Sequence, residues 1–213
     1  MYALIDTTTN MIGFGITQGS KSVTSCFVKS DTTNRDLVTT FTDFIQEHRQ
    51  NMQPNEKPFA GILGIGVVVG PGSFTGVRLG VVIANMVALG AGCDIYPDTT
   101  LSLMVRDEDQ DGVIVVQTSR NDVFVAEYTK GIVGEMHNIS LEDFFVRAQT
   151  ARNLYADIFT STLETLTTHL PELHVTLRDP SFRLTTLNNR ITEHILAPQS
   201  MVLPVYAKQP NIG

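Results

Sequence analysis

The chain is 213 residues long, carries a formal net charge of −7 and contains 17% charged residues. That length allows one domain or two small ones with a sizeable hydrophobic core. The acidic balance disfavours nucleic-acid binding by this chain alone, because neutralising phosphate groups needs a basic surface.

Other features of the sequence favour a soluble, cytoplasmic protein. Cys26 and Cys93 are far apart and form no CxxC motif, which predicts reduced, buried thiols. Asp6 interrupts the apolar N-terminus, so no signal peptide is expected. Arg78 and Asn85 interrupt the best candidate for a membrane span, so we expect no membrane association.

The first half of the chain predicts an α/β layer with the order β-β-β-α-β-α-β. Polar turns at residues 7–10 and 18–21 separate the first three strands. Asn34 can cap the first helix, and a polar linker with two prolines follows that helix at residues 50–58. The expected strands are residues 2–6, 11–16, 22–29, 61–69 and 94–96, and the expected helices are residues 34–48 and 76–89.

The second half partly repeats this order. A helix is expected from Thr99 or Thr100, then a hairpin around Asn121-Asp122 and a helix after the capping box that begins at Ser140. Residues 150–200 are ambiguous, with a strand near Val175. The repeat predicts a duplicated α/β fold with a degraded second copy. The remaining expected elements are strands at residues 113–117, 123–128 and 201–207 and helices at residues 151–166 and 184–195.

A glycine-rich turn at residues 70–76 joins a buried strand to an apolar helix. Such a turn can hold backbone N–H groups at a helix N-terminus, where an anion binds well. The P-loop and dinucleotide patterns both fail here. Arg78 opposes the helix dipole, so we expect an anionic partner, with an internal ion pair favoured over a ligand. The residues of this predicted turn are Gly70, Gly72, Ser73, Phe74, Thr75, Gly76 and Arg78.

The helix at residues 76–89 is apolar nearly all round. One ridge carries small residues four apart, which let another helix approach closely: Gly76, Gly80, Ala84 and Ala88. A glycine inside a helix costs about 1 kcal/mol against alanine, which favours a close-packed interface at Gly80. One face can pack on the sheet, and the second face needs cover from this chain or from another protein.

Several motifs resemble catalytic or metal sites and fail on inspection. The acidic segment 107–111 matches half of an EF-hand loop, but Thr118 stands where the bidentate glutamate is needed, so a solvated loop is favoured. The five histidines form no metal-binding pair. Ser73 lies outside a GxSxG elbow, so a serine nucleophile is disfavoured.

Asp6 and the three threonines after it allow two interpretations. A carboxylate with hydroxyl groups in a hairpin turn can hold phosphate and a magnesium ion. Asp and Thr also favour turns through side-chain-to-backbone hydrogen bonds, and this structural interpretation is favoured.

The sequence resembles the TsaB (YeaZ) family, the dimerisation subunit of the bacterial complex that makes threonylcarbamoyladenosine in tRNA. The glycine-rich segment 70–80 is the specific anchor, and the weaker anchors follow in family order. Residues 130–200 match poorly. The weaker anchors are residues 4–9, Thr99-Thr100-Leu101, residues 115–124 and residues 203–206.

This resemblance implies an actin-like/sugar-kinase (ASKHA, ribonuclease H-like) fold with two related subdomains, at residues 1–100 and, reduced, 101–213. It implies binding to a TsaD-like catalytic subunit, a homodimer when that subunit is absent, and a TsaE-like ATPase reached through the complex. ATP and metal are expected on the partner subunits and none on this chain alone, and tRNA is contacted only indirectly. The interface expected on the two N-terminal-half helices comprises Leu37, Phe41, Gly76, Leu79, Gly80, Ile83, Ala84, Met86 and Val87.

One departure from the family concerns a phosphate site. Where the family usually carries an aspartate, the alignment places Thr118, which weakens a working metal–phosphate site between the subdomains. A vestigial site could retain Asp6, Thr7, Thr8 and Arg120.

The leading hypothesis is a non-catalytic accessory subunit for tRNA threonylcarbamoyladenosine synthesis. The alternative is an ATP-binding phosphotransferase or ATPase of the ASKHA class that uses Asp6, the neighbouring threonines and the glycine turn. A glycopeptidase activity is disfavoured because metal ligands and a nucleophile are missing.

Overall fold

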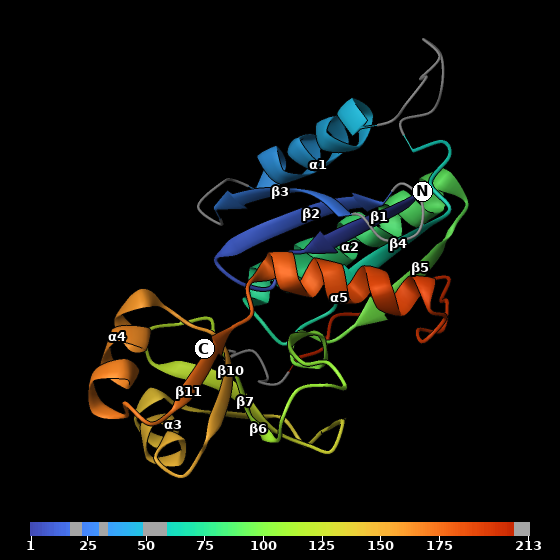
Figure 1. Ribbon diagram of the computed structural model, residues 1–213. Coiled ribbons are helices and arrows are strands. Elements are labelled where there is room, and N and C mark those ends of the chain that lie inside the picture. Colours follow the sequence, from blue (N-terminus) through green and yellow to red (C-terminus); the bar gives the residue numbers. More distant parts are fainter. Residues whose placement is uncertain (18–22, 30–33, 49–58, 207–213) are drawn as a thin grey trace.

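The computed structural model describes residues 1–17, 23–29, 34–48 and 59–206, and these form two lobes, each built on its own β-sheet (Figure 1). The predicted turn at residues 18–21, the linker at 50–58 and residue 207 lie outside the described residues, as does the side chain of Asn34.

The first lobe has a five-stranded sheet in the order β3-β2-β1-β4-β5. β1 pairs antiparallel with β2 and parallel with β4, and β5 extends the parallel side. The elements are β1 (Tyr2–Asp6), β2 (Met11–Thr17), β3 (Val23–Lys29), α1 (Asn34–His48), β4 (Gly64–Val68), α2 (Phe74–Ala91) and β5 (Asp94–Asp98).

The second lobe repeats this topology. β6 pairs antiparallel with β7 and parallel with β10, and β11 extends the parallel side. Its elements are β6 (Gly112–Gln117), β7 (Asp122–Thr129), β8 (Ile132–Val133), β9 (His137–Ser140), α3 (Leu141–Ala148), β10 (Asn153–Asp157), α4 (Thr160–His169) and β11 (His174–Leu177).

Two further helical segments complete the chain. A one-turn 3-10 helix, η1 (Ser102–Met104), connects the lobes, and α5 (Pro180–Thr192) follows β11. α5 crosses back from the second lobe and packs on the first sheet, where Leu184 and Leu187 join Leu4 and Val68 in one cluster. The first sheet therefore has α1 and α2 on one face and α5 on the other (Figure 1).

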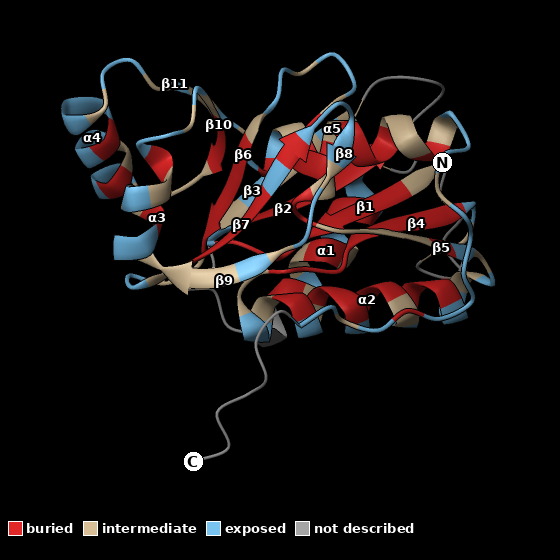
Figure 2. Cartoon of the chain, turned by 90° about the horizontal axis from the view of Figure 1, so that it is seen from below, coloured by how far each residue is buried: buried red, intermediate tan, exposed pale blue. Residues whose placement is uncertain are grey.

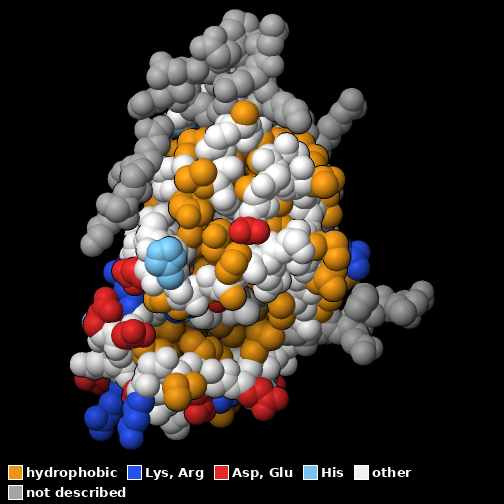
Figure 3. All heavy atoms as spheres, turned by 90° about the vertical axis from the view of Figure 1, so that its right-hand side faces the viewer, with side chains coloured by type: hydrophobic (Ala, Val, Ile, Leu, Met, Phe, Trp, Pro, Cys, Tyr) orange, Lys and Arg blue, Asp and Glu red, His pale blue; other side chains and the backbone are white. Residues whose placement is uncertain are grey.

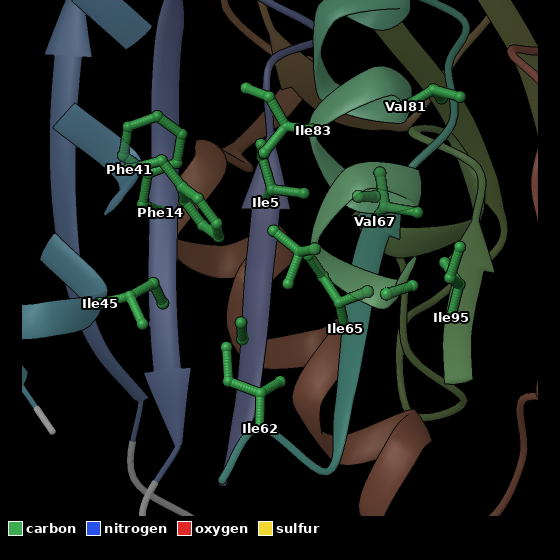
Figure 4. Close-up of a cluster of buried hydrophobic side chains, with 14 of the residues drawn as sticks. Ile5, Phe14, Phe41, Ile45, Ile62, Ile65, Val67, Val81, Ile83 and Ile95 are labelled. Atoms are coloured by element: carbon green, nitrogen blue, oxygen red, sulfur yellow. The ribbon is translucent and has the colours of Figure 1, made fainter. Parts of the chain in front are cut away.

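The main core lies between the first sheet and its two helices α1 and α2. Alternate residues of the strands point toward these helices, as the two-residue repeat of a strand requires. Phe14 of β2 meets Phe41 of α1 edge to face, with ring centroids 5.1 Å apart. Figure 4 shows Ile83 of α2 next to Ile5 of β1, and Ile65, Val67 and Val81 belong to the same buried cluster.

The structure confirms the predicted order of elements in the first half and the duplicated pattern. Ser140 caps α3 by accepting a hydrogen bond from the Asp143 N–H at 3.0 Å, as predicted. The helix expected at residues 151–166 is wrong, because residues 153–157 form the central strand β10 and only the C-terminal part is helical. Thr99 and Thr100 lead into a single 3-10 turn, and residues 201–206 form no regular strand.

Candidate functional site

The glycines of the turn between β4 and α2 allow close approach to neighbouring backbone. Gly70 has φ +107°, a backbone conformation that favours glycine, and a Cβ there would lie 2.6 Å from the carbonyl oxygen of Val205. A Cβ at Gly72 would collide with the carbonyl of Thr8. The turn is therefore shaped by contacts within the chain.

The polar groups of this turn also have internal partners. The Ser73 N–H donates to the Thr8 carbonyl at 2.7 Å, and the Thr7 hydroxyl donates to the Gly76 carbonyl at 2.7 Å. Ser73 caps α2 by accepting from the Gly76 N–H at 3.4 Å. The turn therefore holds the β1–β2 hairpin against α2.

The ridge of small residues on α2 faces the chain itself. A Cβ at Gly76 would collide with the carbonyl of Thr7, and a Cβ at Gly80 with the hydroxyl of Thr7. Ala84 and Ala88 are buried in the first-lobe core. The close approach that the small residues permit is thus between α2 and the end of β1, and the ridge is not a surface for another helix.

This burial corrects most of the predicted interface. Leu79 is half-buried and Met86 is exposed, so these two residues of the predicted set stay available to a partner. The others either line the core or face Thr7, because α1 and α2 both turn their apolar stripes toward the sheet. These internal residues are Leu37, Phe41, Gly76, Gly80, Ile83, Ala84 and Val87.

A second apolar face of α2 nevertheless points away from the sheet. Val82 is 60% exposed, Leu89 87% and Met86 40%, and Phe74 lies exposed at the start of the helix. Figure 2 shows α2 along one edge of the molecule, with buried residues and exposed residues on the same helix. We call Phe74, Val82, Met86 and Leu89 the outer face of α2.

The C-terminal segment extends this apolar surface. Residues 199–206 run beside α2 and β5: the Asn85 amide donates to the Val202 carbonyl at 3.0 Å and accepts from the Val202 N–H at 3.1 Å. The Val205 N–H donates to the Val69 carbonyl at 2.7 Å. Met201 and Leu203 remain exposed. The segment therefore covers part of α2, and its Tyr206 packs against Phe74 with ring centroids 5.4 Å apart, while Val82, Met86 and Leu89 of the outer face stay exposed.

Hydrophobic side chains are widespread on the first lobe. Figure 3 views the molecule from the right-hand side of Figure 1 and shows hydrophobic side chains over much of this face, with most charged side chains toward its lower part. α2 has the length and composition of a membrane span, but its buried residues Val77, Val81 and Val87 make it a core helix of the first lobe.

Arg78 has aromatic partners. Its guanidinium lies 3.8 Å from the centroid of the Phe74 ring, and its Nε donates to the Tyr206 hydroxyl at 2.8 Å. The structure gives Arg78 no ion pair with any described residue, which corrects the expected internal anionic partner. A cation–π contact offsets the unfavourable position of the charge at the helix N-terminus.

The Asp6 carboxylate is buried and fully engaged. Its Oδ1 accepts from the Thr8 N–H at 3.0 Å and from the Thr8 hydroxyl at 2.6 Å, which is the turn geometry favoured above. Its Oδ2 accepts from Arg183 Nε at 2.6 Å. Thr7 and Thr8 are likewise buried, so these residues present no open phosphate site.

Arg183 of α5 is the most unexpected residue of this region, because its side chain is completely buried. Its Nη1 donates to Asp157 Oδ2 at 2.6 Å and to the Arg178 carbonyl at 2.9 Å, and its Nη2 donates to the Thr9 hydroxyl at 3.1 Å. Burial alone lowers the pKa of Arg183, but Asp6 and Asp157 outweigh burial and raise this pKa above its ordinary value.

Arg120 does not join this cluster. It lies exposed in an open, polar groove of about 740 Å³, whose lining includes Asn10, Gln117, Thr118 and Phe159 and not Asp6. The last residue of β6, at the place that Asp6 has on β1, is Gln117. Gln117 Oε1 accepts from the Phe159 N–H at 3.0 Å, at the start of α4.

The remaining candidate groups are the possible metal ligands, the acidic loop at residues 107–111 and the two cysteines. Within the described ranges no cluster of three or more His, Cys, Asp or Glu residues could hold a metal ion. Asp109 of the acidic loop pairs with Arg178 at 2.7 Å and is largely buried, which corrects the expectation of a wholly solvated loop. Cys26 and Cys93 are free but only half-buried.

Sequence signals could have found part of this cluster. Asp6 follows a buried strand and is noticeable, but Arg183 and Asp157 lie in the region where the sequence pattern is ambiguous. The pairing of Asp6 with Arg183 joins residues 177 positions apart in the chain, and local periodicity gives no information about such a contact.

The geometry defines a two-lobed α/β protein whose lobes repeat one sheet topology, as expected for an actin-like/sugar-kinase fold, with an exposed apolar helix face and a guanidinium between its lobes. Residues 39–159, more than half of the chain, match the family model described as TsaD: tRNA N6-adenosine threonylcarbamoyltransferase. The chain belongs to this family.

Solved structures support the predicted TsaB (YeaZ)-like fold. One is an uncharacterized protein with similarity to peptidase YEAZ from Pseudomonas aeruginosa, at 13% identity and TM-score 0.64, with 97% of this chain and 99% of that chain covered. Another is YeaZ from Pseudomonas aeruginosa, at 14% identity and TM-score 0.60, with 96% and 98% covered. No curated protein matches the sequence.

Proposed function

We propose that this chain is a non-catalytic accessory subunit in the synthesis of threonylcarbamoyladenosine in tRNA, and that it binds a TsaD-like catalytic subunit. Family membership and the YeaZ-like fold support the pathway. In this proposal the protein acts in the cytoplasm, reaches a TsaE-like ATPase through the complex and pairs with itself when the catalytic subunit is absent.

The observation that carries the proposal is the outer face of α2. Large apolar side chains on a solvent-exposed helix favour association with another protein, because burying them removes apolar surface from water. The half-buried Leu79 and the exposed Met201 and Leu203 enlarge this surface.

The absence of a catalytic role rests on how the polar residues are used. Asp6, Thr7 and Thr8 are engaged in contacts within the chain, and Ser73 caps α2. In the proposal, ATP and metal are bound by the partner subunits, and tRNA contacts this chain only indirectly. The phosphotransferase alternative needs Asp6 to be accessible, and Asp6 is bonded to Arg183.

The test is a direct binding measurement between the purified chain and the TsaD-like subunit from the same organism. Val82→Glu places a charge in the centre of the outer face without touching the core. We expect binding to weaken at least about tenfold, which is the loss typical of one anchoring side chain. Calorimetry or surface plasmon resonance measures the change.

The matched control is Thr165→Glu on the exposed side of α4, which should leave binding unchanged. Circular dichroism establishes that both variants are folded. Equal affinity of the Val82→Glu variant and the unmodified chain would contradict the proposed surface. Absence of any binding to the TsaD-like subunit by the unmodified chain would contradict the proposed function itself.

A further inference from the structure

The contacts of Arg183 form a shell of oxygen atoms from both lobes. Asp6 and Thr9 come from the β1–β2 hairpin of the first lobe, and Asp157 comes from the end of β10 in the second lobe. The Arg178 carbonyl completes the shell. Two carboxylates, a hydroxyl and a carbonyl around one positive group make an all-oxygen environment of the kind that hard divalent cations take.

We propose that the Arg183 guanidinium is a built-in counter-ion that keeps divalent cations out of the space between the lobes. The positive charge neutralises Asp6 and Asp157, and the guanidinium fills the volume between their oxygens. A divalent cation could enter only by displacing a completely buried side chain that makes four hydrogen bonds.

This arrangement does not fit a metal–phosphate site of the kind expected between the lobes of an actin-like/sugar-kinase fold. Mg²⁺ needs free carboxylate oxygens and keeps several of its waters. Asp6 has no free carboxylate oxygen for Mg²⁺, because Oδ1 accepts a hydrogen bond from Thr8 and Oδ2 accepts one from Arg183. The inference concerns only this chain and holds whether or not the chain binds a TsaD-like subunit.

Removing the guanidinium should uncover a cation site. In Arg183→Ser, the space and the two carboxylates remain, and Mn²⁺ is a suitable probe. We expect the variant to melt at a lower temperature than the unmodified chain without metal, and to bind Mn²⁺. At about 100 times its Kd, Mn²⁺ should raise the melting temperature of the variant by about 5–10 °C.

Two controls isolate the cause. The double variant Asp6→Asn with Arg183→Ser should lose the Mn²⁺ response, because one carboxylate is gone. Arg183→Lys keeps a positive charge and should show no response. Electron paramagnetic resonance of free Mn²⁺ and thermal melts of the full chain give independent measurements of binding.

Each possible result of these experiments either supports or overturns the proposal. A folded Arg183→Ser variant with no Asp6-dependent Mn²⁺ binding would overturn the proposal, as would an equal response in Arg183→Lys. If Arg183→Ser does not fold, the unmodified chain decides: Mn²⁺ binding that Asp157→Asn abolishes overturns the proposal, and absence of such binding supports it.

Discussion

α2 and α4 occupy equivalent places in the two lobes, since each follows the first parallel strand beside the central hairpin. α2 has 18 residues and exposes large apolar side chains, whereas α4 has 10 residues and exposes polar ones. The exposed residues of α4 are Thr160, Ser161, Glu164, Thr165, Thr167, Thr168 and His169.

The difference shows that the fold alone does not require an apolar outer face. α4 buries Thr162 and Leu166 against its sheet and leaves its solvent side hydrophilic. α2 satisfies the same packing requirement with Val77, Val81 and Ile83 and is still apolar on the opposite side. Packing of α2 against its own sheet therefore does not explain why its outer face is apolar.

The first strands of the two lobes, β1 and β6, also end differently. Asp6 ends β1 and is paired with Arg183, while Gln117 ends β6 and binds the start of α4. One lobe uses a buried ion pair where the other uses a neutral amide. These two equivalent strand ends therefore depend on charge to different extents, and substitutions can measure the difference.

The largest expected effect comes from Arg183→Met. Removing one partner of a buried ion pair leaves Asp6 without its counter-charge, so the free energy of unfolding should fall by about 3–5 kcal/mol. Urea unfolding followed by circular dichroism measures this loss. Because Arg183 contacts residues of both lobes, the effect should appear in the single unfolding transition of the whole chain.

The matched control for Arg183 is Arg147→Met, which removes the exposed ion pair with Glu127 at 2.6 Å. Exposed pairs contribute about 0–1 kcal/mol, so this variant should be nearly as stable as the unmodified chain. Adding Asp6→Asn to Arg183→Met should recover part of the loss. If Arg183→Met and Arg147→Met lowered the free energy of unfolding by similar amounts, the buried pair would contribute no more to stability than the exposed pair, contrary to this prediction.

The next effect concerns the approach of α2 to β1. In Gly76→Ala, the new methyl group would collide with the Thr7 carbonyl, and overpacking of this kind costs about 1–3 kcal/mol. Gly90→Ala lies in the same helix, where the new Cβ meets Phe59 at an ordinary 3.4 Å. It should stabilise the chain by up to about 1 kcal/mol through helix propensity. Thermal unfolding of both variants checks the opposite signs.

These glycines show what the sequence could and could not predict. The spacing of Gly76 and Gly80 correctly indicated a close approach to another element. The pattern does not identify that element, because a helix ridge gives no information about which surface it meets, and the structure assigns it to Thr7. Local order was predictable in the same way: strong periodicity located α1, and buried apolar runs located β4 and β6.

The second lobe was less predictable for a physical reason. β10 is a short central strand buried between β6 and β11, and Leu154, Tyr155 and Ala156 show no alternation that would distinguish a strand from a helix. Its strand conformation is fixed by pairing with residues distant in sequence. The Arg183 cluster depends on the same long-range placement, so it too could not be read from local pattern.

A smaller effect on stability is expected from removing the N-cap side chains of α3 and α2. Ser140 accepts from the Asp143 N–H at 3.0 Å, and Ser140→Ala should lower stability by about 0.5–2 kcal/mol. Ser73 accepts at a longer 3.4 Å from the Gly76 N–H, and the start of α2 is also held by the Ser73 N–H bond to Thr8. Ser73→Ala should therefore cost less than Ser140→Ala. A larger loss for Ser73→Ala in urea unfolding would show that capping outweighs the backbone contacts.

The smallest effect on stability is expected on the outer face of α2, and it completes the comparison with α4. Val82→Thr and Leu89→Gln make this face resemble the polar side of α4. Since both side chains are mostly exposed, each change should alter the free energy of unfolding by less than about 0.5 kcal/mol. Self-association measured by analytical ultracentrifugation should weaken, because the apolar surface available for burial shrinks. A marked loss of monomer stability with unchanged association would mean that this face serves the fold and not a partner.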